Sequence, residues 1–458
     1  MTQPCNHIHF IGIGGTGMSG IAKILLNLGY EISGSDLRTS TALNRLKSTG
    51  ARVFIGHKAT NVVGADLVVI SSAIPESNPE YIEAIESKIP VVHRADMLSL
   101  LMEPKKGIAI TGAHGKTTTT SMISLILEKN GYDPTVIIGG ELNDIGGNAT
   151  LGNGDFLVAE ADESDGSFLK LTPYVAVVTN IENDHMDYYK NMNSMKSAFK
   201  NFLNNLKNEG FAVLGTDNEN VREIAENLRR KHYTYGINNT ADYMPKNIFT
   251  NGMFTSFDIF FRDKFLGKVE LRVPGLHNIY NATAAIAVGS ELGISFEGIA
   301  DAIKAFKGVQ RRFQLIGNIN GIKIIDDYAH HPTEIKATLN AAKSCNPRRL
   351  IAIFQPHRFT RTMLLANEFG AAFEDADEVI VTKIFSAGEQ SIEGVSSMLI
   401  VNMLKQNGKK VTYIDEKNEI PDILSKRLKS GDYVMTIGAG DVCKVAYDLT
   451  DRLKNLFG

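Results

Sequence analysis

The sequence predicts a mixed α/β protein with three domains, each containing a mostly parallel sheet. Short apolar runs typical of strands alternate with helical patterns along the chain, as expected for strand–helix–strand units. The alternation starts afresh near residues 105 and 312. At 458 residues, the chain has the length of about three domains of roughly 150 residues each. We therefore expect domains over residues 1–105, 106–312 and 313–458.

The first segment is typical of a Rossmann-like, doubly wound unit. Its strand candidates and helical patterns alternate, which favours a parallel sheet. The strand candidates lie at residues 8–13, 30–36, 66–74 and 89–94, and the helical patterns at 18–28 and 79–86. Charged residues, proline and glycine gather at 102–107, where we place the first boundary.

The middle segment combines a second set of apolar strands with a stretch of different character. Between residues 252 and 274, polar and apolar residues alternate around a turn at 262–264, which predicts an antiparallel hairpin. The apolar strand candidates lie at 107–112, 156–162, 175–181 and 210–215, and helices are expected at 278–292 and 297–306.

The third segment is again Rossmann-like. An Asn-Gly pair at 320–321 predicts a hairpin turn, and strand–helix alternation follows it. The strand candidates there lie at 349–356, 377–385, 410–415 and 432–440.

Composition narrows the class of protein. A hydrophobic fraction of 43% and a charged fraction of 22% are typical of a soluble globular chain. The net charge of -3 offers no general attraction to nucleic acid or to anionic membranes. No apolar run is long enough to insert into a membrane, and three widely spaced cysteines favour a reducing compartment. The first ten residues lack the pattern of a secretory signal, so we expect a cytoplasmic location.

A glycine-rich loop follows the first strand candidate. Gly12, Gly14 and Gly17 match the G-x-G-x-x-G pattern, and Asp36 lies where a dinucleotide-binding fold places the acid that holds a ribose. Taken alone, these residues suggest an NAD-dependent dehydrogenase. The loop recognises a pyrophosphate at a helix N-terminus, however, whatever that pyrophosphate is attached to.

A second glycine-rich loop, AITGAHGKTTTT, gives a stronger signal. Backbone N–H groups after Gly112 would surround phosphates, Lys116 would reach their oxygens, and the Thr117 hydroxyl would ligate Mg²⁺. The spacing departs from the standard Walker motif, because Ile110 stands where that motif has a glycine. The sequence therefore predicts a nucleoside triphosphate site with an unusual loop.

Acidic clusters follow the next two apolar runs. Carboxylates near phosphates suit Mg²⁺, and strand ends are where α/β sheets place ligands. Acidic loops are common without a ligand, but two of them behind a phosphate loop favour a magnesium–nucleotide site. The first cluster contains Glu160, Asp162, Glu163 and Asp165, and the second contains Asn180, Asp184, His185 and Asp187.

Further polar constellations lie towards the C-terminus. Asn278 and Asn281 are three residues apart in a predicted helix, so both amides can address one ligand. Arginines at strand ends suit carboxylate or phosphate recognition, although a solvated surface would also carry them. These constellations contain Arg311 and Arg312, then Asp326, Asp327, Tyr328, His330 and His331, and finally His357, Arg358 and Arg361.

These motifs together resemble the Mur ligase family. The segments TGAHGKTTTT, EADESD, TNIENDHMD, GLHNIYNA, VQRRF, DDYAHHPTE and QPHRFTRT occur in that order, and the resemblance covers nearly the whole chain. It implies a first domain that binds a UDP-sugar, a P-loop ATPase-like middle domain that binds ATP, and a third domain that closes over ATP and the acceptor.

The resemblance also implies a reaction. The motifs are most similar to the branch of the family that joins L-alanine to the lactyl carboxylate of UDP-N-acetylmuramate during peptidoglycan precursor synthesis. That reaction passes through an acyl phosphate, gives ADP and phosphate, and uses ATP and Mg²⁺. The expected partners are these small molecules, with no nucleic acid or membrane, and the expected state is a monomer or weak homodimer. The alternatives are a murein-peptide ligase adding a tripeptide to the same sugar, the dehydrogenase, and an ATPase without ligase chemistry.

Site residues carry over from the resemblance position by position. Metal and catalytic roles fall on Lys116, Thr117, Glu160, Glu163, His185, Arg312 and Asp327, with Glu160 and Glu163 both open as the main metal ligand. ATP contacts fall on Gly112, Ala113, His114, Gly115, Lys116, Thr117, Thr118, Asn278, Asn281, Arg312, Asp327 and His331. UDP-sugar contacts fall on Gly12, Gly14, Gly15, Thr16, Gly17, Met18, Asp36, Ser71 and Ser72, and acceptor contacts on His357, Arg358 and Arg361.

Overall fold

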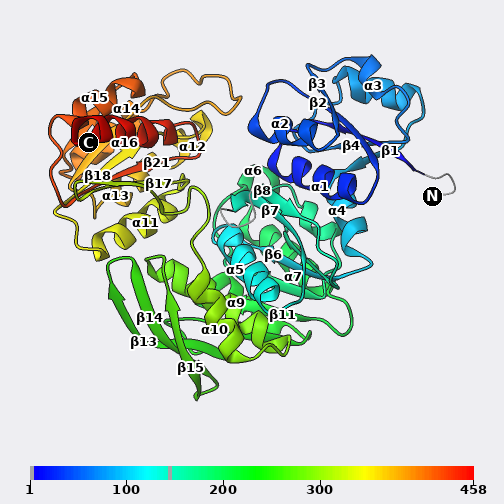
Figure 1. Ribbon diagram of the computed structural model, residues 1–458, viewed down its shortest axis with the longest axis horizontal. Coiled ribbons are helices and arrows are strands. Elements are labelled where there is room, and N and C mark those ends of the chain that lie inside the picture. Colours follow the sequence, from blue (N-terminus) through cyan, green and yellow to red (C-terminus); the bar gives the residue numbers. More distant parts are fainter. Residues whose placement is uncertain (1–4, 143–146, 458) are drawn as a thin grey trace. The chain divides into compact units, whose positions relative to one another are not determined.

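The computed structural model describes residues 5–142 and 147–457, which form three sheets flanked by helices (Figure 1). Grouped by their contacts, the residues form two compact units. The first contains residues 1–246, 258–269 and 280–304, and the second contains residues 247–257, 270–279 and 305–458. The predicted α/β fold class is confirmed. The three domain boundaries remain a prediction. In the described part of the chain, no helix is long and apolar enough to cross a membrane.

The first sheet has five parallel strands in the order β3-β2-β1-β4-β5. The strand order reverses at β1, which is where open α/β sheets bind ligands. Its strands are β1 (His7–Ile11), β2 (Glu31–Asp36), β3 (Arg52–Ile55), β4 (Leu67–Ile70) and β5 (Val91–His93). Its helices are α1 (Thr16–Asn27), α2 (Thr41–Ser48), α3 (Pro79–Glu86) and α4 (Arg94–Met102).

Both faces of this first sheet are covered. Ile8 and Phe10 of β1 pack in one core with residues of α1, α2 and α4, whereas Ile11 packs in another with Ala84 of α3. The side chains of a strand alternate between faces, and this explains the two cores. No apolar run marks β3 in the sequence as a buried strand, because β3 is a largely exposed edge strand.

The second sheet places the nucleotide motifs on neighbouring parallel strands. Its order is β15-β14-β13-β12-β11-β10-β6-β9-β7-β8, and β6 pairs in parallel with β9 and β10. Its strands are β6 (Lys106–Thr111), β7 (Thr135–Leu142), β8 (Gly147–Thr150), β9 (Phe156–Glu160), β10 (Val175–Val178), β11 (Phe211–Gly215), β12 (His232–Tyr235), β13 (Tyr243–Asn251), β14 (Phe254–Phe261) and β15 (Lys264–Leu271). The helices of this region are α5 (Lys116–Lys129), α6 (Met186–Tyr189), α7 (Met192–Asn204), α8 (Glu219–Asn227), α9 (Leu276–Glu291) and α10 (Phe296–Ala305).

The predicted hairpin between residues 252 and 274 is confirmed. The turn between the neighbouring strands β14 and β15 is made by Arg262 and Asp263, whose φ angles are 46° and 65°. Two successive residues with positive φ form the tight turn that matches the twist of a hairpin. The sequence did not reveal β7, β8 and β12, which are short or interrupted by glycines.

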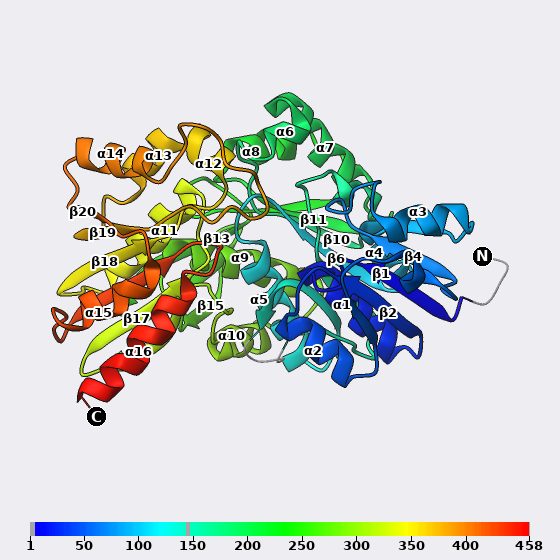
Figure 2. The ribbon, with the colours of Figure 1, turned by 90° about the horizontal axis from the view of Figure 1, so that it is seen from above.

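The third sheet has the order β16-β17-β21-β18-β19-β20, in which only β16 is antiparallel to its neighbour. The hairpin predicted at 320–321 joins β16 to β17. The strands are β16 (Gln314–Ile319), β17 (Ile322–Asp327), β18 (Arg349–Phe354), β19 (Glu378–Val381), β20 (Val411–Tyr413) and β21 (Asp432–Ile437). The helices are α11 (Pro332–Ser344), α12 (Phe359–Leu364), α13 (Ala366–Ala372), α14 (Met398–Gln406), α15 (Ile420–Ser425) and α16 (Cys443–Phe457), the last shown lengthwise in Figure 2.

Candidate functional site

The loop after β6 depends on its glycines. Gly112 and Gly115 have φ angles of 128° and 83°, which favour glycine. A Cβ at Gly112 would lie 2.3 Å from Thr179 Oγ1, and one at Gly115 would lie 2.4 Å from Asn281 Oδ1. The loop therefore passes between the segment that follows β10 and helix α9, with no room for larger residues.

The loop is fixed by side chains that follow β10. Asn180 Oδ1 accepts a hydrogen bond from His114 N (2.9 Å), and Asn180 Nδ2 donates to His114 O (3.1 Å). Thr179 Oγ1 also donates to His114 O (2.6 Å). The Nε2 atom of His114 lies 3.1 Å from Glu182 Oε2. Sequence analysis missed Thr179, and it placed Asn180 among possible ligands rather than among residues that hold the loop.

Lys116 begins α5 and turns back over the loop. Its Nζ donates to Gly112 O (2.5 Å) and to Glu163 Oε1 (2.7 Å). Burial lowers the pKa of Lys116, but the Glu163 carboxylate outweighs this effect and raises the pKa above its ordinary value. Lys116 is therefore cationic at neutral pH.

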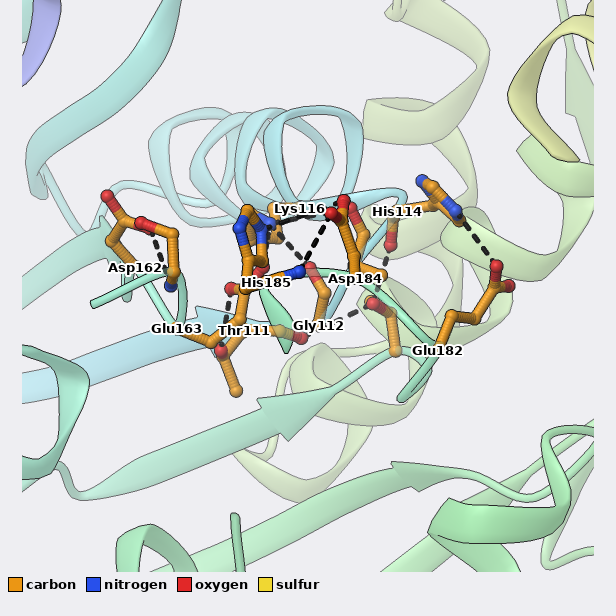
Figure 3. Close-up of polar contacts among 12 residues, drawn as sticks. Thr111, Gly112, His114, Lys116, Asp162, Glu163, Glu182, Asp184 and His185 are labelled. Carbon is orange, nitrogen blue, oxygen red and sulfur yellow. Dashed lines mark hydrogen bonds and ion pairs between the residues drawn. The ribbon is translucent and has the colours of Figure 1, made fainter. Parts of the chain in front are cut away.

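Glu163 is the centre of the polar cluster drawn in Figure 3. Its side chain is only 2% exposed, and besides Lys116 it accepts a hydrogen bond from Thr111 Oγ1 (3.2 Å). His185 Nε2 lies 3.9 Å from Glu163 Oε1 and 3.7 Å from Asp184 Oδ2. The loops after β6, β9 and β10 thus bring a lysine, two carboxylates and an imidazole together.

The structure separates the two glutamates that sequence analysis left open. Glu160, the last residue of β9, accepts a hydrogen bond from Gly139 N (2.9 Å). Glu163 lies in the turn beyond, against Lys116 and near His185. A carboxylate beside an imidazole is a donor set that suits a divalent cation next to phosphates. Glu163 and His185 are therefore the better pair of candidate metal ligands.

The loop after β1 is held by Asp36. Asp36 Oδ2 accepts a hydrogen bond from Gly14 N (2.9 Å), and a Cβ at Gly14 would lie 2.7 Å from the same oxygen. Asp36 Oδ1 accepts a longer bond from Arg38 N (3.4 Å). Both carboxylate oxygens thus accept hydrogen bonds from backbone N–H groups. Asp36 therefore supports the glycine-rich loop, whereas the sequence pattern predicted that it would bind a ribose.

Arg94 is a site residue that sequence analysis missed. It follows β5 directly, and its guanidinium donates to Asp162 Oδ2 at 3.1 Å. A Cβ at Gly17 would lie 2.8 Å from the same guanidinium, so Arg94 packs against the start of α1. An arginine placed directly after a parallel strand was a signal that could have identified it.

The first glycine-rich loop and Lys116, at the end of the second, line one pocket, which we call the two-loop pocket. It has a volume of about 590 Å³ and lies wholly within the first unit. From the loops and helices around the first sheet it is lined by Gly12, Gly15, Thr16, Gly17, Met18, Ile21, Asp36, Leu37, His57, Ser71, Ser72, Ala73, Ile74, Arg94 and Leu98. From the second it is lined by Lys116, Ile137, Ile138, Gly139, Glu160 and Asp162.

The two asparagines of α9 have different partners. Asn281 Oδ1 faces Gly115 of the second loop. Asn278 Nδ2 donates to Pro274 O (2.7 Å), one turn earlier in the chain. The expectation that both amides address one nucleotide therefore stays a prediction, with Asn281 the one in contact with the loop.

In the second unit, Asp327 is buried in a local network. Its carboxylate accepts hydrogen bonds from Phe313 N, Ala329 N and Thr338 Oγ1, each at 2.8 Å. Burial raises the pKa of Asp327, while the charge of Arg312 and these hydrogen bonds oppose the rise. Asp327 thus fixes the chain around Phe313, and its expected contact with a nucleotide stays a prediction.

The other candidates of the second unit gather around Tyr328. The Arg312 guanidinium lies 5.3 Å from the Tyr328 ring centroid and 3.6 Å from Glu334 Oε1. His331 caps α11 through its side chain, which accepts a hydrogen bond from Thr333 N. These positions suit helix capping and cation–π packing, and a nucleotide contact remains a prediction for both residues.

The expected acceptor residues lie beyond β18. Arg361 approaches His357 Nδ1 at 3.3 Å, and the His357 ring stacks on Phe385 with 5.7 Å between centroids. Burial, together with the charge of nearby arginines, lowers the pKa of His357 to about 4. Neutral His357 therefore lies beside a cationic arginine. Arg358, with a φ of 72°, directly precedes α12.

Comparison with known proteins matches three family models along the chain. The Mur ligase family catalytic domain covers residues 7–106, the Mur ligase middle domain covers 110–289, and the Mur ligase glutamate ligase domain covers 311–440.

Similar proteins cover almost the entire chain. UDP-N-acetylmuramate–L-alanine ligase of Pelotomaculum thermopropionicum is 54% identical over 450 residues, which is 98% of each chain. The enzyme of the same name from Geotalea daltonii is 52% identical over 98% of each chain. A crystal structure of UDP-N-acetylmuramate–alanine ligase from Thermotoga maritima, 30% identical, covers 98% of this chain and 99% of its own with a TM-score of 0.86. The predicted resemblance is confirmed, and the chain belongs to the Mur ligase family.

Proposed function

We propose that this chain is an ATP-dependent ligase that joins L-alanine to the lactyl carboxylate of UDP-N-acetylmuramate. The two-loop pocket is the observation that carries the proposal, because the first glycine-rich loop and Lys116, at the end of the second, line one cavity. An enzyme that transfers phosphate from one nucleotide to a group carried by another needs such a cavity. The names and coverage of the relatives support the same reaction.

The first loop would bind the UDP moiety. Its N–H groups at the start of α1 favour a pyrophosphate, and Ser71 and Ser72 line the same cavity. The muramate carboxylate would then extend towards Lys116, Glu160 and Asp162 on the opposite wall. This placement leaves the first loop with a binding role, which is why the dehydrogenase interpretation is not supported.

The second loop would bind ATP. Lys116 carries a positive charge beside the loop and would neutralise phosphate oxygens. Glu163 and His185, with Thr117 at the start of α5, would hold Mg²⁺. A bound Mg²⁺ would draw electron density from the phosphate oxygens and so favour transfer of the γ-phosphoryl group.

The reaction has to activate a carboxylate, which is a poor electrophile because oxide is a poor leaving group. A lactyl carboxylate oxygen would attack the γ-phosphorus of ATP, and the bond to the bridging oxygen would break with release of ADP. The alanine amine would then attack the acyl carbon and lose a proton, and the C–O bond to phosphate would break. His357, Arg358 and Arg361 are proposed to bind the carboxylate of the incoming amino acid.

A phosphate-release assay tests the proposal. We expect turnover only when ATP, Mg²⁺, UDP-N-acetylmuramate and L-alanine are all present, with one phosphate released per amide formed. Equal release without the amino acid would contradict the ligase function and support a simple ATPase. Turnover with an L-alanyl tripeptide in place of alanine would instead assign the murein-peptide ligase reaction.

A further inference from the structure

A buried polar network meets the two-loop pocket at His57, and the proposed reaction leaves this network without a role. Its centre is Glu80 of α3, whose side chain is 0% exposed. Around it lie His9 of β1, Ser35 of β2, Asn61 and His57. Only His57 of these five residues lines the pocket.

Glu80 is held as a carboxylate that only accepts hydrogen bonds. Oε1 accepts from Asn61 Nδ2 (2.5 Å), and Oε2 accepts from Ser35 Oγ (2.5 Å). His9 Nε2 lies 3.6 Å from Oε2. Burial raises the pKa of Glu80, but the nearby His9 imidazole and the hydrogen bonds from Ser35 and Asn61 outweigh it and bring the pKa to about 2. Glu80 is therefore ionised at neutral pH.

This charge determines the direction of the next hydrogen bond. Ser35 has one hydroxyl proton, which it gives to Glu80. Ser35 Oγ can then only accept from His57 Nδ1, 2.9 Å away, and Glu80 Oε2 lies 3.3 Å from the same nitrogen. Nδ1 must therefore carry a proton. In neutral His57, Nε2 is left as a hydrogen-bond acceptor.

The position of His57 indicates what its Nε2 would meet. His57 follows the edge strand β3, two places from β1 in the sheet. In folds of this order a pyrophosphate binds after β1 and the ribose after β2. The base then lies further out, towards the end of β3. Within the described residues, no hydrogen bond to His57 Nε2 is found, and the ring lines the cavity with Asp36 and Leu37.

We infer that Glu80 is a positioning residue that acts through Ser35 to hold His57 in its Nδ1–H form, so that Nε2 accepts a hydrogen bond from the nucleoside of the bound UDP-sugar. The inference rests on the proposed function for the identity of the ligand. It adds a recognition element for the nucleoside and assigns the buried carboxylate a purpose beyond folding.

The first test needs no ligand and no activity. In the ¹⁵N-histidine-labelled full chain, the His57 signal, assigned by its loss in His57→Gln, is expected to show a protonated Nδ1 and an unprotonated Nε2 at pH 7.5. The Glu80→Gln variant should lose this bias, because its neutral amide can offer an N–H to Ser35. A wild-type His57 with its proton on Nε2 would overturn the inference, even if the chain proves to be the proposed ligase.

The second test measures binding of UDP by calorimetry in a double-mutant cycle. Glu80→Gln and His57→Gln should each weaken UDP binding about fivefold to tenfold, and the double variant should be no weaker than His57→Gln alone, because Glu80 acts through His57. Glu86→Gln, an exposed position of the same helix, should leave binding unchanged. Additive losses would overturn the inference and leave Glu80 a purely structural role.

Steady-state kinetics distinguish a failure of this inference from a failure of the ligase assignment. Glu80→Gln should raise the KM for UDP-N-acetylmuramate by a similar factor while kcat changes less than twofold. A folded Glu80→Gln variant with wild-type KM would contradict the inference without touching the ligase assignment. Absence of turnover in the wild type would contradict the ligase assignment and leave the result for His57 standing.

Discussion

The two glycine-rich loops share a backbone plan but differ in what surrounds them. Each follows the strand at which the strand order of its sheet reverses, β1 or β6, and each leads into a helix, α1 or α5. The first loop is supported by a carboxylate, Asp36, that accepts a backbone N–H. The second is supported by an amide, Asn180, and is covered by Lys116.

This difference separates holding a phosphate from transferring one. N–H groups and a helix start are enough to bind a diphosphate, and both loops have them. Phosphoryl transfer also needs positive charge that stabilises the transition state. The second loop has Lys116 with Glu163 and His185 beside it, whereas Arg94, which packs against the start of the helix after the first loop, is already paired with Asp162. We therefore propose that the same local pattern serves binding in the first loop and phosphoryl transfer in the second.

The largest expected effect comes from removing Lys116, which tests whether the second loop differs from the first in catalysing phosphoryl transfer. Lys116→Ala should lower kcat by about three orders of magnitude, since the charge acts on phosphate in the transition state. UDP binding, measured by calorimetry, should remain within twofold of wild type. Lys129→Ala, at the exposed end of the same helix, is the matched control. Near-normal turnover of Lys116→Ala would mean that the second loop, like the first, only binds.

Neutralising Glu163 should have the next largest effect. Glu163→Gln keeps the shape of the side chain and can still accept from Thr111, but it loses the charge that faces Lys116. We expect kcat to fall about a hundredfold and the Mg²⁺ concentration for half-maximal rate to rise, because a carboxylate is a better ligand for Mg²⁺ than an amide. Titration of turnover with Mg²⁺ measures both quantities. If Glu160→Gln shifts the Mg²⁺ dependence and Glu163→Gln does not, the assignment of the two glutamates is reversed.

On the first loop, crowding should affect binding rather than chemistry. In Gly14→Ala the new methyl group would lie 2.7 Å from Asp36 Oδ2, so the carboxylate or the loop has to move. We expect the KM for UDP-N-acetylmuramate to rise about tenfold, with kcat within threefold of wild type. Gly20→Ala, whose methyl group would meet only ordinary contacts at 3.4 Å, is the control. A loss of kcat in Gly14→Ala as large as that in Lys116→Ala would contradict a purely binding role for the first loop.

The sequence alone could predict those parts of the candidate site whose position follows from the order of the strands in the sheet. The loops after β6, β9 and β10 carry the predicted clusters, and they meet because the ends of neighbouring parallel strands share one edge. The hairpin turns at Arg262-Asp263 and Asn320-Gly321 were also predictable, because local residue preferences determine tight turns.

What depends on the conformation of an irregular loop or on a distant partner could not be predicted. Glu160 ends a strand and Glu163 lies three residues later, so the conformation of the turn decides which one faces Lys116. Arg94 meets Asp162 across 68 positions of sequence, and no local pattern links them. Asp36 stands where the dinucleotide pattern places it, yet its partner is Gly14 N, which no sequence motif specifies.

Substitution of Asp36 should have the smallest effect, and it distinguishes two roles for this residue in the first loop. Asp36 either supports the loop or binds the ribose, and the two roles predict different outcomes. If it supports the loop through Gly14 N, Asp36→Ala should weaken binding of UDP and of 2′-deoxy-UDP by the same factor of about threefold to fivefold. Asp36→Asn, which retains an acceptor oxygen, should lose less than twofold. If Asp36 instead holds the ribose, wild type should prefer UDP over the deoxy ligand and Asp36→Ala should abolish that preference. We expect equal weakening in calorimetric titrations, because both oxygens of Asp36 already accept backbone N–H groups.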